Sequence, residues 1–140
     1  MNFNSFIKKQ EEKEPTNFKE ACSKANLNLM KKFFDEKKIN INEKDSYGRT
    51  FLISCCWSSK KEEISDCVKF LLDFEDIDVN AICDRATALI FALWQCGLDC
   101  HSSVHKERFE TVKMLVQDPR VDVNLGVLGG ELSHIPKETL

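Results

Sequence analysis

The sequence predicts an all-α fold in which similar pairs of helices are stacked one after another. The main observation is a block that occurs three times without internal gaps, at residues 29–42, 67–80 and 111–124. Each copy opens with apolar residues at helical spacing, which predicts one amphipathic helix. Each copy closes with alternating apolar and polar residues that end in asparagine, which favours an extended segment and a turn. A fixed block at intervals of this length indicates an array of similar structural units.

A further helix is expected ahead of each block. Thr50 and Thr87 each precede an apolar run, at 51–56 and 88–93. A threonine in this position can cap a helix, because its hydroxyl accepts a hydrogen bond from a free amide in the first turn. Residues 18–22 supply a comparable apolar segment in the first unit, without the threonine. The predicted unit is therefore turn, helix, loop, helix and extended tip.

Composition excludes several classes of protein. The chain has 140 residues, of which 42% are hydrophobic and 31% charged, as in one ordinary globular domain. The formal net charge of −3 provides no overall positive field for nucleic acid or an anionic membrane. No apolar run is long enough to span a bilayer, and the first residues do not resemble a signal peptide. We expect an intracellular, cytoplasmic protein with no nucleic-acid or membrane partner.

The seven cysteines are expected to be mostly reduced thiols. Their number is odd, and no export signal accompanies them. Several stand where a small apolar residue is expected, a role that buried free cysteine fills well.

The segment from Asn42 to Leu52 resembles the ankyrin repeat family. The family unit of about 33 residues carries a T-P-L-H-x-A motif, a V-x-x-L-L helix and a V-N segment that enters a β-turn finger. Asp45, Gly48 and Thr50 fall at the family's spacing, and the glycine supplies the positive φ that such a turn commonly needs. The resemblance implies an ankyrin-type helix-turn-helix solenoid with β-turn fingers.

The sequence departs from the family pattern in three respects. The second finger has no glycine and reaches Thr87 one residue early, so an irregular finger is expected. Both threonine motifs lack the family's proline and histidine, which removes a polar link between neighbouring repeats and is expected to reduce rigidity more than fold. Residues 58–65 and 96–106 are predicted to be lengthened loops between helices.

The predicted domain organisation has three parts. Residues 1–17 form a charged N-terminal extension, and residues 18–124 form the repeat domain, divided at about 18–42, 43–80 and 81–124. Residues 125–140 form an irregular tail or the start of a truncated repeat, since glycines and Pro136 argue against an immediate helix.

The resemblance implies a concave binding face made of fingers and inner helices. Trp57 and Trp94, the two tryptophans of the chain, each lie seven residues after a motif threonine. They are therefore predicted to be neighbours in an aromatic platform for a protein partner. The alternative is that each indole is covered by its own long loop and belongs to the core. The finger residues expected beside them, either as partner contacts or as solvated turns, are Ser46, Tyr47, Arg49, Asp84 and Arg85.

The main chemical alternative to a protein-binding surface is a zinc site. Cys96, Cys100, His101 and His105 have the ligand types for zinc. The pairs lack the intervening dozen residues of a familiar finger, and on one continuous helix the four side chains would not converge. We therefore expect no metal and no cofactor. No oxyanion loop, orienting residue or phosphate-binding loop accompanies the cysteines and histidines, so no enzyme is predicted.

The preferred function is a non-catalytic module that binds a protein partner on the concave face. The alternatives are a zinc-stabilised module and a capping or scaffold segment of a longer array; the chain itself is expected to be a monomer or part of such an array. A hydrophobic terminal face and concentration-dependent association would support the scaffold alternative. Asn80 and Asn124 resemble asparagines that hydroxylases modify in other ankyrin proteins, but a structural role in the turn is preferred.

Overall fold

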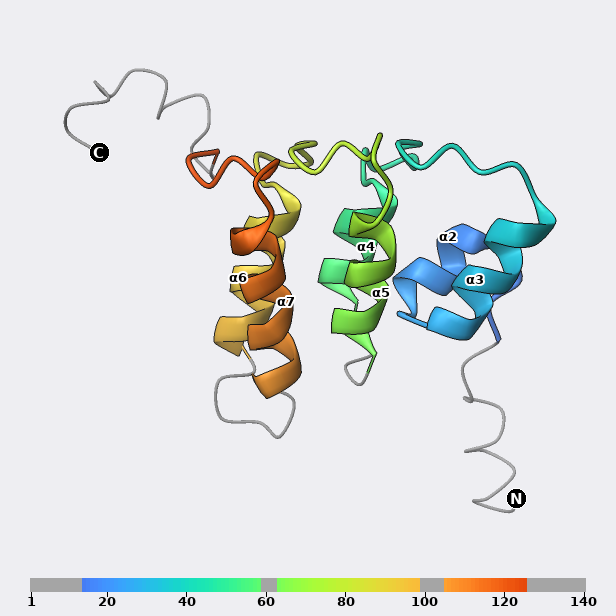
Figure 1. The fold of residues 1–140 in the computed structure, drawn as a ribbon, viewed down its shortest axis with the longest axis horizontal. Helices are drawn as coiled ribbons and strands as arrows, with labels where there is room; N and C mark the ends of the chain where they lie inside the picture. Colours follow the sequence, from blue (N-terminus) through green and yellow to red (C-terminus); the bar gives the residue numbers. More distant parts are fainter. Residues whose placement is uncertain (1–13, 59–62, 99–104, 126–140) are drawn as a thin grey trace, which may run out of the picture.

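The computed structural model describes residues 14–58, 63–98 and 105–125, which form six helices arranged as three pairs (Figure 1). The pairs are α2 (Phe18–Ser23) with α3 (Leu27–Glu36), α4 (Phe51–Trp57) with α5 (Ile64–Leu72), and α6 (Ala88–Leu98) with α7 (His105–Gln117). The predicted all-α helical repeat is confirmed. Helix α6 continues to Leu98 and α7 begins at His105, so the loop expected at 96–106 is shorter than predicted.

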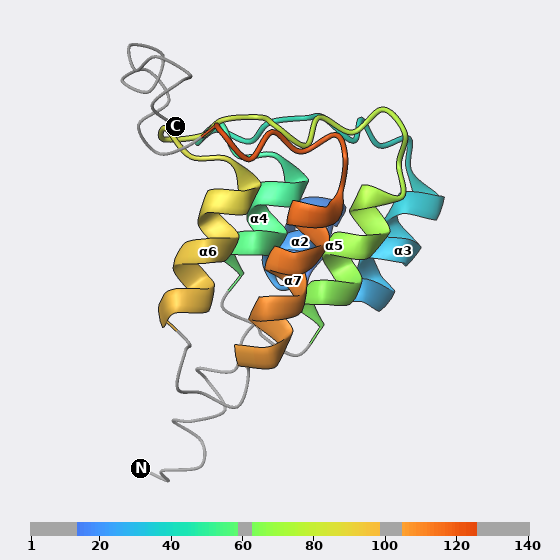
Figure 2. The same cartoon turned by 60° about the vertical axis from the view of Figure 1, so that its left-hand side comes forward.

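The helices form two layers, and the extended fingers run along one edge of both. Helices α2, α4 and α6 make the inner layer and α3, α5 and α7 the outer layer (Figure 2). Neighbouring inner helices are in contact, and they carry small buried side chains such as Ala21, Cys55 and Ala92. Small residues allow the helices to approach closely, and each pair buries its apolar side against the next.

Three side chains cap the inner helices at their first turns. Thr50 Oγ1 accepts a hydrogen bond from the Ile53 amide at 3.3 Å, and Thr87 Oγ1 accepts one from Ile90 at 3.4 Å. The predicted threonine caps are therefore confirmed. In the first unit, where no threonine stands, Asn17 Oδ1 accepts from the Glu20 amide at 2.9 Å. Asparagine is an equally good cap, but the sequence analysis did not identify it.

The two complete fingers turn by different means. In the first, the Gly48 amide donates to the Asp45 carbonyl at 2.9 Å, and Gly48 has the expected positive φ of 81°. In the second, Cys83 and Ala86 exchange both backbone hydrogen bonds, at 2.9 and 3.0 Å. As expected, the second finger departs from the first: Asp84 and Arg85 both take positive φ, which closes a tight two-residue hairpin without glycine.

Asparagine bridges join each finger to the next. Asn42 Nδ2 donates to the Asp76 carbonyl at 2.8 Å, and its Oδ1 accepts from the Asp78 amide at 2.7 Å. Asn80 repeats this arrangement one repeat later, donating to the Arg120 carbonyl at 2.9 Å and accepting from the Asp122 amide at 2.8 Å. A polar link between repeats is thus present although the motif histidine is absent.

Polar side chains from a later repeat also satisfy the helix ends of the repeat before it. Glu63 accepts from the Leu27 amide at the start of α3, and Glu107 accepts from the Ser65 amide at the start of α5. At the other ends, buried Arg108 donates to the Ser58 carbonyl after α4, and Arg120 donates to the Leu72 carbonyl that ends α5. These two contacts measure 2.8 and 2.7 Å. The carbonyls and amides left free at helix termini thereby gain partners.

Replacing Asn80 with alanine is expected to lower the free energy of unfolding by about 1–3 kcal/mol, because a carbonyl and an amide lose their partner. The matched control is Asn124→Ala, since the Asn124 side chain bonds to none of the described residues. Urea denaturation of both variants checks this. Equal losses for the two substitutions would contradict the structural role of the Asn80 bridge.

The ion pair beside this bridge predicts a loss of stability in acid. The hydrogen bond from Arg120, at 2.7 Å, lowers the pKa of Asp118 below its usual 3.8, although burial opposes the shift. Because the folded-state pKa is the lower one, the contribution is present above about pH 4 and is lost as the pH falls further. Asp118→Asn is expected to cost up to about 1 kcal/mol at pH 7 and progressively less below pH 4. Denaturation at pH 7, 5 and 3.5 measures this; a constant difference would oppose it.

Candidate functional site on the concave face

An aromatic row crosses the inner layer between the second and third repeats. Trp57 at the end of α4 and Trp94 on α6 are each 42% exposed. Both indoles meet the ring of Phe91 edge-on, with centroid separations of 5.2 and 5.5 Å. The structure therefore brings the two tryptophans to either side of one phenylalanine, and neither indole is buried.

Phe91 was missed by sequence reasoning. It is buried and stands at the position that Ser54 takes in the preceding repeat, so the repeat pattern does not mark it. The available signal was its spacing, because Phe91 lies three residues before Trp94 and hence on the same side of α6. Phe91 fixes the orientation of both indoles through ring contacts of a favourable geometry.

The finger residues named from the sequence are accessible. Ser46, Asp84 and Arg85 are exposed at the turns. Tyr47 is also exposed, and the Arg49 guanidinium lies 4.8 Å from the centre of its ring. A cation over an aromatic face is attracted by the electron-rich ring, which holds these two side chains together.

Asp45 fixes Arg49 within the first finger. Its carboxylate accepts from the amides of Tyr47 and Arg49 and from Arg49 Nε, each at 2.9 Å. Burial acts to raise the pKa of Asp45, but these hydrogen bonds and the guanidinium charge lower it overall. The carboxylate is therefore ionised at neutral pH and satisfied by its own turn.

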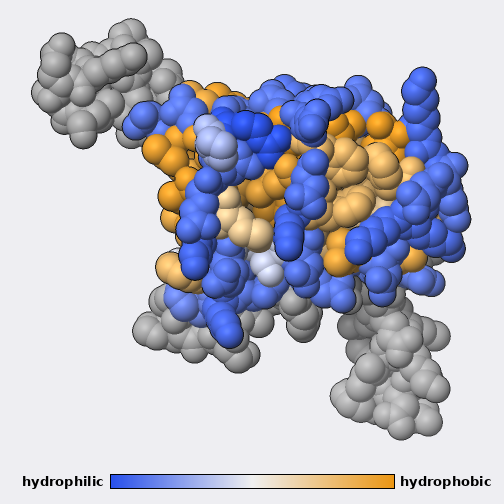
Figure 3. Space-filling view, in the orientation of Figure 1, coloured by the Kyte–Doolittle hydropathy of each residue, from blue (hydrophilic) through white to orange (hydrophobic). Residues whose placement is uncertain are grey.

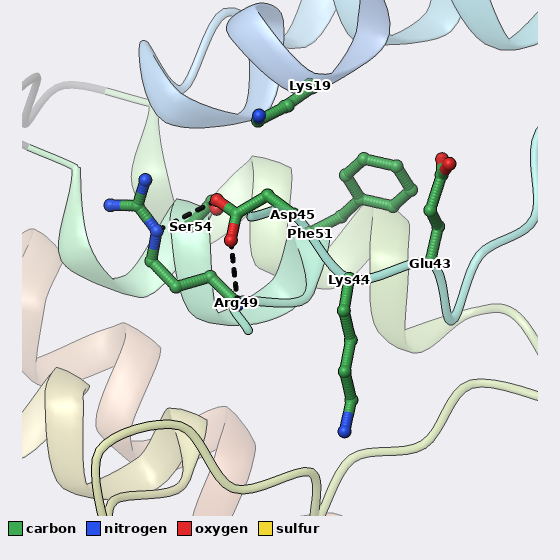
Figure 4. A pocket seen from close by; sticks show the side chains of 7 residues that line it. All are labelled: Lys19, Glu43, Lys44, Asp45, Arg49, Phe51 and Ser54. Atoms are coloured by element: carbon green, nitrogen blue, oxygen red, sulfur yellow. Dashed lines mark hydrogen bonds and ion pairs between the residues drawn. The ribbon is translucent and has the colours of Figure 1, made fainter. Parts of the chain in front are cut away.

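A pocket of about 200 Å³ opens between this finger and the inner helices (Figure 4). Lys19 comes from α2, and Phe51 and Ser54 come from α4. Figure 4 shows the Arg49 guanidinium beside the Asp45 carboxylate and the Lys19 ammonium above it. The finger completes the lining with Glu43, Lys44, Asp45 and Arg49.

The pocket can donate hydrogen bonds to an acidic group. Lys19 Nζ and the two Nη atoms of Arg49 bond to no atom of the described residues, whereas the Asp45 carboxylate is already satisfied. Ser54 also lies three residues before Trp57, so the pocket and the aromatic row are neighbours on the surface of α4. Sequence reasoning missed this pocket because its walls come from two separate stretches of the chain, α2 and residues 43–54.

The proposed zinc ligands are only partly described. Cys96 Sγ lies 3.8 Å from His105 Nδ1, so these two side chains do meet. Cys100 and His101 lie outside the described residues. Among residues 14–58, 63–98 and 105–125, no group of three or more potential metal ligands occurs.

The cysteines of the described segments are free thiols, and most are buried. A hydrogen bond with Cys22, together with burial, raises the pKa of Cys55 well above its ordinary range. Burial likewise raises the pKa of Cys56 and Cys67. A nucleophilic cysteine needs the opposite shift, toward the thiolate. Cys55 and Cys56 on α4 and Cys67 on α5 are residues of the buried core.

Comparison with known proteins agrees with this geometry. A family model described as ankyrin repeats, in three copies, matches residues 18–126. The chain belongs to the ankyrin repeat family. No curated protein and no solved structure shows significant similarity to it. Ankyrin repeats are generally modules for protein–protein interaction and are typically non-catalytic. Among the helices described for this ankyrin chain, none is long and apolar enough to cross a membrane.

The thiol environments predict a pattern of alkylation in the native protein. Cys55, Cys56 and Cys67 are expected to resist iodoacetamide until the protein unfolds, because they are buried and protonated. Cys96, which is partly exposed, is expected to react first among the described cysteines. Peptide mass spectrometry after short exposures, with and without urea, measures each site. Native labelling of Cys55 at the rate of Cys96 would refute this assignment of the core.

Proposed function

We propose that this ankyrin repeat protein binds a protein partner on its concave face and catalyses no reaction. The observation that carries the proposal is the aromatic row, in which Trp57 and Trp94 are exposed but held in place by Phe91. Tryptophan is frequent among the residues that dominate interface energies, because it buries a large area with few rotatable bonds.

The surface also suggests the chemistry of the partner. Apolar side chains of the partner would lie on the indoles of Trp57 and Trp94. An acidic side chain of the partner, next to these apolar ones, would enter the pocket and accept hydrogen bonds from Lys19 and Arg49. Such a segment combines an apolar anchor with a desolvated charge pair, an arrangement that provides both affinity and orientation. Tyr47 and the second finger would contribute the surrounding rim.

We further propose that the protein binds its partner in a reducing compartment inside the cell. The six cysteines of the described segments are free, and Cys22 and Cys55 lie within hydrogen-bonding reach of each other without forming a disulfide. Reduced thiols are typical of the cytosol.

The test is an affinity pull-down with the full chain, compared with a variant carrying Trp57→Ala and Trp94→Ala. Each substitution is expected to reduce partner affinity by about 2 kcal/mol or more, as removal of an interface anchor does. Folding is expected to be largely retained, because both indoles are about two-fifths exposed. Partners that the native chain retains and the variant loses are then titrated against both proteins.

Lys69→Ala is the control. It removes an exposed side chain from the outer helix α5 and should leave binding unchanged. Unchanged partner binding by the double tryptophan variant, together with a lower unfolding temperature, would reject the proposal and make the tryptophans structural residues.

A further inference from the structure

Three phenylalanine rings form a patch on the outer layer, over the groove between the first and second repeats. Phe34 lies on α3, Phe70 lies on α5, and Phe74 follows α5. Their ring centroids are 4.8 to 6.1 Å apart, and each side chain is partly exposed. We refer to these three residues as the outer patch. Figure 3 shows hydrophobic side chains gathered on this face of the molecule, where Figure 1 places α3 and α5.

Stacking of the repeats does not require these rings. In the next groove, between α5 and α7, the equivalent positions of the repeated block hold Leu72, Met114 and Asp118. These side chains help to line a hollow of about 420 Å³. The second and third repeats are nevertheless in close contact through both layers. The aromatic rings of the outer patch therefore exceed what the packing of two outer helices needs.

The rings of the outer patch are held in a fixed arrangement. Phe34 meets the buried ring of Phe18 at a centroid separation of 6.1 Å, and Phe70 meets Phe74 edge-on. Ordered side chains lose little rotational freedom when another surface covers them. Covering partly exposed rings also removes apolar area from water. The outer patch is therefore suited to contact with a second apolar surface.

The two sides of the outer patch carry opposite charge. Residues 31–38, in and after α3, contain four lysines and two acidic residues, a formal charge of +2. Residues 66–78, in and after α5, contain five acidic residues and one lysine, a formal charge of −4. None of the charged side chains in the two segments forms an ion pair with a described residue. These charges are available to a surface that covers the patch.

Helical spacing places some of these charges directly beside the rings. Lys31 lies three residues before Phe34 on α3, and Asp66 lies four residues before Phe70 on α5, so each charge shares a helix face with a ring. Both charged side chains are exposed. The outer patch thus has a basic border on α3 and an acidic border on α5.

This pattern makes the surface complementary to itself. A two-fold axis that runs along the groove between α3 and α5 places α3 of one copy over α5 of the other. The basic border of each copy then meets the acidic border of its partner, and the two outer patches meet at the centre. Opposite charges across an interface favour this register and oppose an arrangement that sets α3 against α3. Two-fold dimers are the commonest assemblies of identical chains.

We propose that the outer patch is the contact surface of a symmetric homodimer, in which the lysines of residues 31–38 face the acidic residues of 66–78 in a second copy. A second copy is the occupant because one chain presents both halves of the required surface. The rings are only partly exposed, so a weak dimer at the small end of interface sizes is expected. Trp57 and Trp94 lie on helices of the inner layer and stay accessible. A dimer departs from the monomer that the sequence analysis expects.

Sedimentation velocity of the full chain, from low to high micromolar concentration, tests the proposal. The average mass of the native chain is expected to rise from that of a monomer toward that of a dimer. Lys31→Glu with Lys38→Glu makes both borders acidic, whereas Asp66→Lys, Asp73→Lys and Glu75→Lys together make both borders basic. Each variant alone is expected to stay monomeric, because like charges meet. An equal mixture of the two is expected to recover the dimer, and circular dichroism checks that both variants are folded.

Lys113→Glu is the matched control. Lys113 is exposed on α7 at the position that Lys31 takes on α3, and its variant is expected to dimerise as the native chain does. A native chain that is monomeric at every concentration, native-like dimerisation of either charge-reversed variant, or a mixture that stays monomeric would overturn the proposal. Assemblies larger than a dimer would indicate head-to-tail packing and would also overturn it.

Dimerisation and partner binding are separate results. The variant with Trp57→Ala and Trp94→Ala keeps the outer patch, so it is expected to dimerise as the native chain does even where it loses a partner. Loss of the dimer in that variant would place the contact on the inner layer and would contradict the assignment to the outer patch.

Discussion

The contact between one repeat and the next is the interaction on which this structure depends. A pair of short helices cannot bury both of its apolar sides alone, so each pair is stable only when a neighbour covers it. The small inner residues Ala21, Cys55 and Ala92 make this contact close. The asparagine bridges fix its register, because Asn42 and Asn80 each bind one carbonyl and one amide of the following finger. Apolar burial supplies the main stabilisation, and the bridges select one alignment of the repeats.

The polar links to the helix ends, unlike the asparagine bridges, all run from a later repeat to the one before it. Glu63, Glu107, Arg108 and Arg120 all satisfy helix ends in the repeat before their own. A repeat therefore gains partners for its backbone from the repeat that follows it. The third repeat supplies such groups to the second, but no described residue supplies them to the third. The third repeat also carries the exposed apolar side chains Leu93, Phe109, Val116 and Val123.

The sequence was sufficient for the features that depend on local pattern. The repeated block predicted the outer helices, and Thr50 and Thr87 predicted the starts of α4 and α6, since capping requires only a hydroxyl at the right spacing. The two-residue hairpin of the second finger was not predicted, because Asp84 and Arg85 adopt positive φ without glycine, a conformation that is uncommon for arginine. The pocket beside Lys19 and the contact of Phe91 with both indoles could not be predicted, because they depend on how separate repeats are placed in space.

The packing of the repeats bears directly on the surface proposed to bind a partner. A flexible exposed tryptophan loses rotational freedom when a partner binds, and that loss offsets part of the gain from burial. Here Phe91 meets both indoles edge-on, and Asp45 and Tyr47 together orient Arg49. The side chains proposed to contact a partner are thus ordered before it arrives. Because Phe91 lies on α6 and Trp57 on α4, this order depends in turn on the stacking of the second and third repeats. A substitution that loosens the Asn80 bridge should therefore weaken partner binding as well as stability, even though Asn80 lies away from the indoles in the sequence and makes no contact with them.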